Sequence, residues 1–528
     1  MGCGVVWSAR TRDPGGRYAK CPCRHGCGCG AGLCVRRAAS ADPFTLGDPV
    51  TVTGPSPFAP GCGGPGEAGP SSVLYQNGEV EPSVAVNPTN PNNIVGFWQQ
   101  DRWSDGGAHG LLAGFSRDGG QNWFPSAPQF TTCAGGTGKS GGYERASDPW
   151  VSFGPTGTLH AISISFDNST PRNAVLASRS TDGGATWSDP AVLRFDNPRA
   201  LGNNFNDKES ITADPTDAHF VYAIWDRLIS PSNNSSARAF ERSVSFHGPT
   251  WLARSTDDGV TWEPARPIFD PKSQNQTIAN QIVVLPDGTV VDGFTLLNGH
   301  KNAHGTRGGS VALLRSHDKG QTWESKPTIV NSLQTVGVVD PDPDAPCPDP
   351  DSQGACPVRT GDIIPDFAVD RSSGAMYAVW QDSRFSNGSH DDIAFSRSTD
   401  GGNTWSDPVK VNQTTNDAAA FTAAVHVRSD GTVAVTYYDF RNDQNGDATL
   451  DTDHWMVHSH DGGRTWDPSE ARLTPSSFDM RTAPFAVGYF VGDYEGLDNA
   501  GNAFTPFFVI ANNGNASNPT DALFRTAG

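Results

Sequence analysis

The sequence predicts an all-β protein built from one repeated unit, and three observations support that class. The 528 residues include 59 glycines and 40 prolines, which punctuate the chain with turns. Short runs rich in Val, Ile, Phe and Ala lie between these turns, as expected of buried strands. An eight-residue motif recurs along most of the chain, so one repeated domain is favoured over the roughly three domains that length alone suggests.

The repeated motif is Ser-x-Asp-x-Gly-x-x-Trp. It occurs six times, beginning at Ser116, Ser180, Ser255, Ser316, Ser398 and Ser459. Successive starts are 64, 75, 61, 82 and 61 residues apart, a period typical of an array of supersecondary units. The Asp can accept backbone N–H groups in a hairpin turn, the Gly permits a left-handed backbone, and the Trp buries a large ring. We therefore interpret these residues as structural rather than catalytic.

On this motif the chain resembles the Asp-box, or bacterial neuraminidase, repeat family over residues 44–528. The resemblance implies a β-propeller of four-stranded blades, the fold to which sialidases belong. It is less specific for activity, because Asp boxes also occur in propellers that are not sialidases.

The two ends of the repeated region are predicted to meet. After the last motif, residues 492–497, 503–510 and 522–525 predict three strands of a seventh unit, and residues 44–52 match its missing fourth strand. Pairing both ends in one blade would leave no open edge. The sequence thus favours a single all-β propeller of seven blades, with the six usual in sialidases as the alternative. It would span residues 42–528, after a separate segment 1–41.

The functional face is predicted on the rim opposite the motifs. Because strands alternate in direction, the motifs share their rim with short turns, whereas long connections such as 226–248 and 332–364 share the other. Long loops on a rigid ring are where binding is usually built. The predicted first strands begin at this rim, and their starts are acidic: Glu81, Asp148, Glu209, Asp366 and Asp493.

Several predicted second strands end in an Asp and an Arg after a large aromatic residue. The arginines are Arg102, Arg227, Arg384 and Arg441. One interpretation is an Asp–Arg clasp within each blade, which the repetition itself favours. The other is a ring of guanidinium groups that binds a carboxylate in bidentate geometry.

The family resemblance implies roles for these groups. Sialidases hold the substrate carboxylate with three arginines and use a tyrosine nucleophile, a glutamate that assists it and an aspartate as acid/base. By blade position, the catalytic roles fall on Tyr494, Glu209 and Asp148 respectively, and the carboxylate-binding role on Arg102, Arg384 and Arg441. Arg227 and Arg481 are alternatives for the arginines, and Asp101 for the proton donor.

One family motif is missing. Sialidases carry Phe/Tyr-Arg-Ile-Pro at the first inner strand, whereas residues 80–83 read Val-Glu-Pro-Ser, with Glu81 where the arginine belongs. The sequence predicts a sialidase-like glycoside hydrolase of the exo-α type that acts on terminal sugars of glycans. The alternatives are a glycosidase of other specificity that uses paired carboxylates, and a non-catalytic propeller that binds glycans or proteins.

The charge balance excludes some partners. The net charge of −19 argues against binding nucleic acid or an anionic membrane surface. We expect a monomer that acts on a glycan or sialoglycoconjugate, with no cofactor required. No histidine spacing typical of zinc is found. Asp443, Asn445 and Asp447 alternate as in a structural calcium loop, but the glycine expected at the sixth position is missing, which favours a solvated acidic loop.

The cysteines indicate an oxidising compartment. Cys62 with Cys133, and Cys347 with Cys356, are predicted to form disulfides, which suits a secreted or extracellular protein. Six other cysteines lie in segment 1–41, which ends in Ala-Ala-Ser-Ala like a signal peptide but lacks the apolar core that should precede it. That segment is interpreted as an aberrant signal region, or alternatively as a disordered cysteine-rich tail.

Overall fold

The computed structural model describes residues 44–197, 204–229, 247–301, 307–349, 354–444 and 446–528. Its contacts divide the chain into Met1–Asp42 and Pro43–Gly528. The segment 1–41 and Asn445 of the calcium-loop prediction lie outside the described residues. The second unit carries all the structure that follows.

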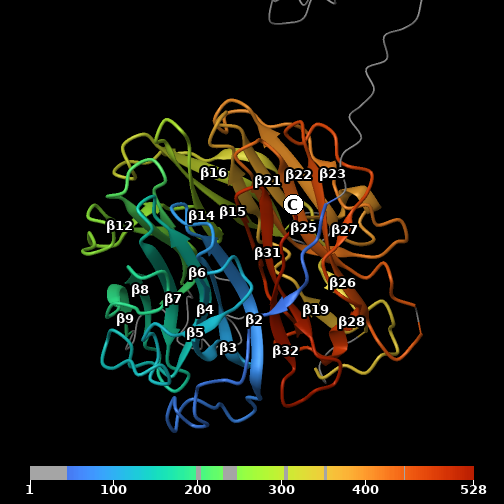
Figure 1. Ribbon diagram of the computed structural model, residues 1–528, viewed down its shortest axis with the longest axis horizontal. Coiled ribbons are helices and arrows are strands. Elements are labelled where there is room, and N and C mark those ends of the chain that lie inside the picture. The colour runs from blue at the N-terminus through green and yellow to red at the C-terminus, as the bar shows by residue number, and fades with distance from the viewer. Residues whose placement is uncertain (1–43, 198–203, 230–246, 302–306, 350–353, 445) are drawn as a thin grey trace, which may run out of the picture. The chain divides into compact units, whose positions relative to one another are not determined.

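The described fold is all-β, and most strands belong to antiparallel four-stranded arrangements (Figure 1). One sheet joins two such arrangements: β2 (Leu74–Val86), β3 (Ile94–Trp103), β4 (Ala108–Ser116) and β5 (Phe124–Ser126), then β6 (Arg145–Phe153), β7 (Leu159–Phe166), β8 (Asn173–Ser180) and β9 (Ala191–Asp196). Two four-stranded sheets follow: β10 (Asn204–Ala213), β11 (Val221–Ile229), β12 (Thr250–Ser255) and β13 (Arg266–Phe269), then β14 (Gln276–Val284), β15 (Val290–Lys301), β16 (Arg307–Ser316) and β17 (Thr328–Leu333).

The second half of the unit repeats the pattern. One sheet is β20 (Asp366–Val369), β21 (Met376–Asp382), β22 (Asp392–Ser398) and β23 (Val409–Lys410). The next is β24 (Ala420–Val427), β25 (Val433–Asp439), β26 (Asp451–Ser459) and β27 (Ala471–Arg472), with β28 (Phe478–Asp479) paired to β26. A small extra sheet holds β18 (Val338–Val339), β19 (Pro357–Arg359) and β29 (Tyr489–Phe490). The two short 3₁₀ helices are η1 (Ser383–Ser386) and η2 (Met480–Thr482). Within the described ranges, no helix is long and apolar enough to span a membrane.

Both ends of the unit meet in one sheet, as the sequence predicts. Its order is β1 (Val50–Thr51), β32 (Thr520–Phe524), β31 (Ala503–Ala511) and β30 (Gly496–Ala500). Val50 of β1 pairs with Phe524 of β32. Figure 1 shows the blue segment that begins the second unit beside the red strands β31 and β32. The N-terminal strand therefore completes a sheet begun by the last three long strands.

The first strands of these arrangements contact one another in succession, and the last returns to the first. The contacting pairs are β2–β6, β6–β10, β10–β14, β14–β20, β20–β24, β24–β30 and β30–β2. Side chains of one strand bond the backbone of the next: Ser83 Oγ accepts from Val151 N at 3.2 Å, and Asp498 Oδ2 accepts from Val86 N at 2.8 Å. Apolar clusters fill the space between neighbouring sheets. The arrangement is consistent with a β-propeller.

The six repeated motifs fold alike. In the first, Asp118 Oδ1 accepts the Asn122 backbone N–H at 3.0 Å, and Ser116 Oγ accepts the Gly120 N–H at 2.9 Å. The other five copies make the same two bonds. The Trp123 indole donates to the Gly120 carbonyl at 2.9 Å and packs on Phe524 of β32. The motifs are thus turn structures, in line with their structural interpretation.

Gly120 offers a test of how the first motif is tied to the last sheet. Its φ is +92°, and a Cβ there would lie 2.0 Å from the Phe524 ring, whereas Gly431 has φ +83° with open space around it. Both alanine variants pay backbone strain of about 1 kcal/mol, but only Gly120→Ala must also displace Phe524, at about 1–3 kcal/mol more. We expect a Tm roughly 1–3 °C lower than that of Gly431→Ala by calorimetry, because a unit of this size has a large unfolding entropy. Equal Tm values would contradict this packing.

Candidate functional site

The innermost strands share a backbone irregularity at their starts. In β6, β10, β14 and β24 the strand register shifts at one place, and in β2 it shifts at two, the second between Val80 and Ser83. At the single shifts and at this second shift of β2, one residue has a left-handed backbone, with φ between +44° and +58°: Glu81, Asp148, Lys208, Ala279 and Thr422. Such a conformation is costly for residues other than glycine and clusters at functional sites. Three of these five positions carry charged side chains.

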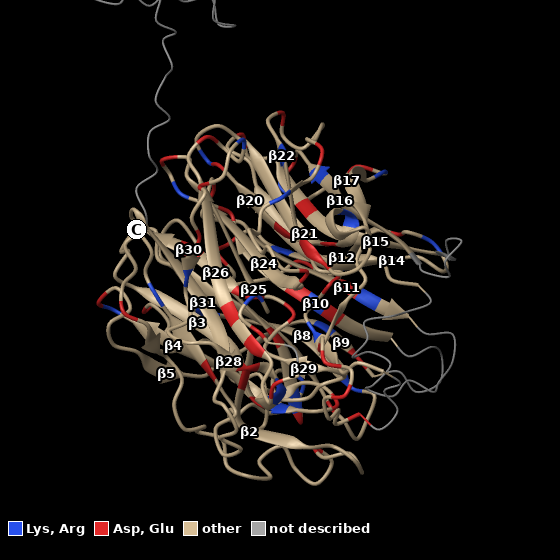
Figure 2. Ribbon diagram, turned by 90° about the vertical axis from the view of Figure 1, so that its right-hand side faces the viewer, with Lys and Arg blue, Asp and Glu red and all other residues tan. Residues whose placement is uncertain are grey.

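The two acidic residues of this set, Glu81 and Asp148, meet the third, Lys208, at its ammonium group, where Asp493 joins them. Its Nζ lies 3.1 Å from Glu81 Oε1, 3.6 Å from Asp148 Oδ1 and 2.7 Å from Asp493 Oδ2. The four side chains come from β10, β2, β6 and the segment before β30, and none is more than 5% exposed. Figure 2 shows acidic and basic segments next to one another along β10 and β11. We call Glu81, Asp148, Lys208 and Asp493 the channel cluster.

Arg359 joins this cluster from the small extra sheet. Its Nη2 and Nε lie 2.6 and 3.0 Å from the two carboxylate oxygens of Asp493. β19, which carries Arg359, pairs with β29, so the insertion after β17 is fixed where this bidentate contact forms. The guanidinium also lies over the Phe490 ring, 4.4 Å from its centroid. Asp493 is therefore held by two cations.

Tyr494 lies beside the same groups and is their more exposed neighbour. Its hydroxyl donates to the Pro149 carbonyl at 3.1 Å, and Lys208 Nζ is 5.8 Å from its ring centroid. The residue is half-buried, unlike the cluster members. Burial raises the pKa of its phenol well above the usual value, and the nearby carboxylates, Glu81 and Asp148 foremost, raise it further. The phenol is therefore protonated at neutral pH.

The surrounding carboxyl groups differ in the direction of their pKa shifts. Burial raises the pKa of Glu81 and of Glu209 well above the usual value. Burial also opposes ionisation of Asp148, but the Lys208 charge and the Ser147 hydroxyl outweigh it and lower that pKa. For Asp493, Arg359 and Lys208 together outweigh burial and lower the pKa. Paired acids with opposed shifts are what acid/base catalysis requires.

Glu209 and Asp226 have buried carboxylate oxygens that accept no hydrogen bond from the described residues. Glu209 Oε1 accepts from the Ile164 backbone N–H at 2.5 Å, but its Oε2 has no hydrogen-bond partner among the described residues. Both carboxylate oxygens of Asp226 also lack a hydrogen-bond partner among the described residues. Buried polar atoms usually have partners, so unpaired ones indicate a strained or functional region.

The structure brings some of the predicted site residues together. Tyr494 and Asp148, predicted as catalytic groups, lie beside Lys208, whereas the third, Glu209, follows Lys208 in the chain and bonds the Ile164 backbone N–H. Arg102 is linked to them: its Nη1 donates to Gln99 Oε1 at 2.9 Å, and Gln99 Nε2 donates to Glu81.

The other predicted arginines are bound by carboxylates elsewhere. Arg384 pairs with Asp382 at 2.7 Å, and Arg441 pairs with Asp439 at 2.6 Å and also with Glu470. In both cases the Asp ends the second strand of the same sheet, which is the clasp that repetition favours. The alternatives differ: Arg227 pairs with Asp196 at 2.7 Å, and Arg481 with Asp340 at 2.7 Å.

Two site residues were not predicted from the sequence. Lys208, rather than the neighbouring Glu209, occupies the position equivalent to Glu81 and Asp148. Counting back from the turn that ends each first strand would have found it, because each of the three residues precedes that turn by the same number of positions. Arg359 carried no comparable signal, because it belongs to an insertion that interrupts the repeat.

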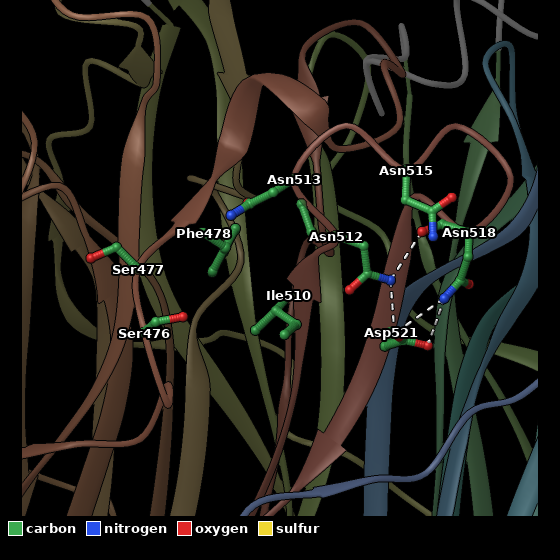
Figure 3. Close-up of a pocket in the computed structure, with 10 residues that line it drawn as sticks. Ser476, Ser477, Phe478, Ile510, Asn512, Asn513, Asn515, Asn518 and Asp521 are labelled. Carbon is green, nitrogen blue, oxygen red and sulfur yellow. Dashed lines mark hydrogen bonds between the residues drawn. The ribbon is translucent and has the colours of Figure 1, made fainter.

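A separate hollow of about 450 Å³ lies at the end of β31 and β32. Figure 3 shows Asn512 and Asn518 converging on Asp521, with Phe478 and Ile510 beside them. Asn512 Nδ2 donates to Asp521 Oδ2 at 2.7 Å, and Asn518 Nδ2 donates to the same oxygen at 3.2 Å. Because these polar groups bond one another, we assign the hollow no role.

The acidic loop, for which a calcium site is the less favoured interpretation, uses its carboxylates on its own backbone. Asp443 Oδ1 accepts the Asp451 N–H at 2.9 Å, and Asp447 Oδ1 accepts the Thr449 N–H at 3.0 Å. Burial raises the pKa of Asp443. The calcium prediction remains a prediction.

Comparison with known proteins finds no matching family model and no matching curated protein. Solved structures of similar fold include the Hadza microbial sialidase Hz136, with 15% identity over 82% of this chain and 76% of that one, and a TM-score of 0.44. The Penicillium chrysogenum α-L-arabinanase complexed with arabinobiose has 10% identity over 91% of this chain and 98% of that one, with a TM-score of 0.43. The leech intramolecular trans-sialidase has 10% identity over 87% of this chain and 92% of that one, with a TM-score of 0.42. These likenesses are weak, and none assigns an activity to this chain.

Lys208→Met tests the electrostatics of the channel cluster. It leaves buried carboxylates without their shared cation, which costs about 3–5 kcal/mol. The difference in unfolding free energy between the parent and Lys208→Met should shrink as pH falls towards about 4, for two reasons. In the variant the carboxyl pKa values rise, so protonation restores stability, whereas in the parent the lowered pKa of Asp493 makes stability fall with pH.

The matched control is Lys410→Met. Lys410 pairs with Asp392 at 2.7 Å, but its side chain is 32% exposed. We expect a loss under about 1 kcal/mol for this pair. Thermal unfolding at neutral and acidic pH measures both variants, and a Lys208→Met deficit that is independent of pH would contradict the assignment.

Proposed function

We propose that this chain is a seven-bladed Asp-box β-propeller and a glycoside hydrolase whose reacting groups surround the channel cluster. The closed succession of contacts among seven first strands supports the blade number. The pairing of β1 with β32 supports closure by the two ends of the unit. Cys62 is bonded to Cys133 and Cys347 to Cys356, which supports secretion of the protein.

The observation that carries the enzymatic proposal is the meeting of three buried carboxyl groups, those of Glu81, Asp148 and Asp493, around Lys208 beside Tyr494. Asp148 is the ionised member and suits the role of base or nucleophile, whereas Glu209 keeps its proton to higher pH and suits the role of acid. In hydrolysis the acid gives its proton to the leaving-group oxygen, while the carboxylate receives one from water or bonds the sugar carbon. This assignment reverses the acid role that the family resemblance implies for Asp148.

The preferred substrate is a terminal sugar without a carboxylate. Two of the three arginines expected to hold a sialic acid carboxylate, Arg384 and Arg441, already pair with carboxylates of their own sheets. Lys208, which lies near the Tyr494 ring, and Arg359 are both paired with Asp493. An anionic substrate would have to displace Asp493 before it gained a bidentate partner.

Sialidase activity is the second candidate. It is favoured by Tyr494, whose phenol lies among Glu81, Asp148, Glu209 and Asp493 in the combination that the family mechanism uses. In that case Arg359 would exchange Asp493 for the substrate carboxylate.

Fluorogenic glycosides test the proposal. We expect the purified protein to release 4-methylumbelliferone from neutral-sugar conjugates faster than from the sialic acid conjugate. Asp148→Asn should lower kcat/KM by about 10²–10⁴-fold, and Glu209→Gln should remove the alkaline limb of the pH profile. The control is Tyr489→Phe, which removes a hydroxyl bonded to the Pro346 carbonyl outside the cluster, and it should keep full activity.

Tyr494→Phe separates the two candidates. A tyrosine nucleophile predicts loss of sialoside turnover, whereas paired carboxylates predict that neutral glycosides are still cleaved. Absence of turnover with every conjugate, together with binding to a glycan array, would replace both with a glycan-binding role.

A further inference from the structure

A second group of ligand-type side chains lies outside the channel cluster, against β4. Cys62, Glu67, His109 and Cys133 each offer one ligand atom, and these four atoms lie within 4.8 Å of one another. Glu67 and His109 are buried, and the two cysteines are half-buried. In the structure the cysteines are joined as a disulfide. A disulfide by itself needs neither an imidazole nor a carboxylate beside it.

The His109 ring is oriented as a metal ligand would be. Its Nδ1 lies 3.1 Å from Asp101 Oδ2, so the aspartate fixes the proton on Nδ1 and leaves the Nε2 lone pair directed at the group. Nε2 has no hydrogen-bond partner in the described part of the chain, although the side chain is only 1% exposed. Asp101 is itself held, because its Oδ2 accepts from Ser56 Oγ at 2.6 Å and its Oδ1 from Asn77 N at 2.8 Å. A carboxylate that orients a ligating histidine is typical of zinc sites.

Glu67 supplies an oxygen on the other side. Its Oε2 is 3.6 Å from His109 Nε2, too far for a hydrogen bond, and accepts the Gly63 backbone N–H at 2.7 Å. A Cβ at Gly63 would come within 2.4 Å of that oxygen, so the loop wraps closely around the carboxylate. Arg145, which binds the Glu67 carbonyl and Asp105, places a positive charge nearby. Zinc ligands lie about 2.0–2.3 Å from the ion, so shifts of about 1 Å would bring these side chains onto one centre.

We propose that Cys62, Glu67, His109 and Cys133 form a Zn²⁺ site when their disulfide is reduced. A phosphine supplies two electrons and water supplies one oxygen and two protons, so the S–S bond breaks, two thiols form and the phosphine leaves as its oxide; a dithiol instead passes its two hydrogens to the cysteines and leaves as a cyclic disulfide. Zinc then binds two thiolates, the His109 Nε2 and the Glu67 carboxylate, and the thiol protons pass to solvent. The oxidised chain holds the same loops with a covalent bond, so either state ties residues 54–73 to β4. This proposal does not rest on the glycosidase activity.

Residue-resolved alkylation of the full-length chain tests the site. The protein is reduced with a phosphine, incubated with or without Zn²⁺, treated with iodoacetamide and mapped by mass spectrometry. We expect zinc to slow the alkylation of Cys62 and Cys133 by about tenfold or more. The pair Cys347 and Cys356 is the internal control and should react equally with and without zinc, because the ligand group that contains Cys62 includes neither of them.

Variants separate coordination from simple burial. His109→Asn should abolish the protection of both cysteines while circular dichroism shows the strand content unchanged. If that variant does not fold, Glu67→Gln replaces it and should shift half-maximal protection to at least about tenfold higher zinc. Unprotected Cys62 and Cys133, equal protection of the control pair, or protection that survives these substitutions would overturn the proposal.

Discussion

The innermost strands have an unpaired edge, and the structure depends on how that edge is satisfied. β10, β14, β20, β24 and β30 each end their sheet, so backbone groups on one side have no partner strand. Side chains from the neighbouring unit supply the bonds instead: Asp366 Oδ2 accepts Val425 N at 2.7 Å, and Gln281 Oε1 accepts Phe367 N at 3.0 Å. Buried backbone groups without partners are costly, so polar side chains are required here even though the surroundings are apolar. This requirement accounts for several acids that the sequence places at strand starts.

Some features of the repeated unit could be predicted from the sequence, and others could not. The motif turns, the pairing of both ends of the unit and the two disulfides follow from local patterns such as glycine position and cysteine spacing, and sequence predicts them. The bulges at the starts of the first strands have no such local signature, because one inserted residue changes which side chain faces inward; only counting back from the turn at the far end of each strand locates it. At β10 this puts Lys208 into the position of Glu81 and Asp148, while Glu209 bonds the backbone of β7.

Long-range contacts were the other limit. Arg359 reaches Asp493 from an insertion, 134 residues earlier in the chain. His109 meets two cysteines and a glutamate that are far from it in sequence, so no short spacing marks the group. The Asp–Arg signature was visible in the sequence, but its two interpretations differ only in whether the arginine binds its own aspartate. Arg384 and Arg441 do so, and side-chain geometry was needed to decide it.

Residues that recur in every unit differ in their role from residues that occur in one unit. A feature present in every unit, such as the motif turn, serves the requirement that every unit shares. Lys208, Arg359 and Tyr494 occur once each, and they meet where three adjacent strands have strained backbones and buried charges. Apolar residues at these positions would cost less, since the pairing of buried charges seldom compensates for their removal from water. The strained backbone recurs in five first strands, but the buried charges are confined to residues that break the repeat, which supports the proposal that this cluster serves chemistry.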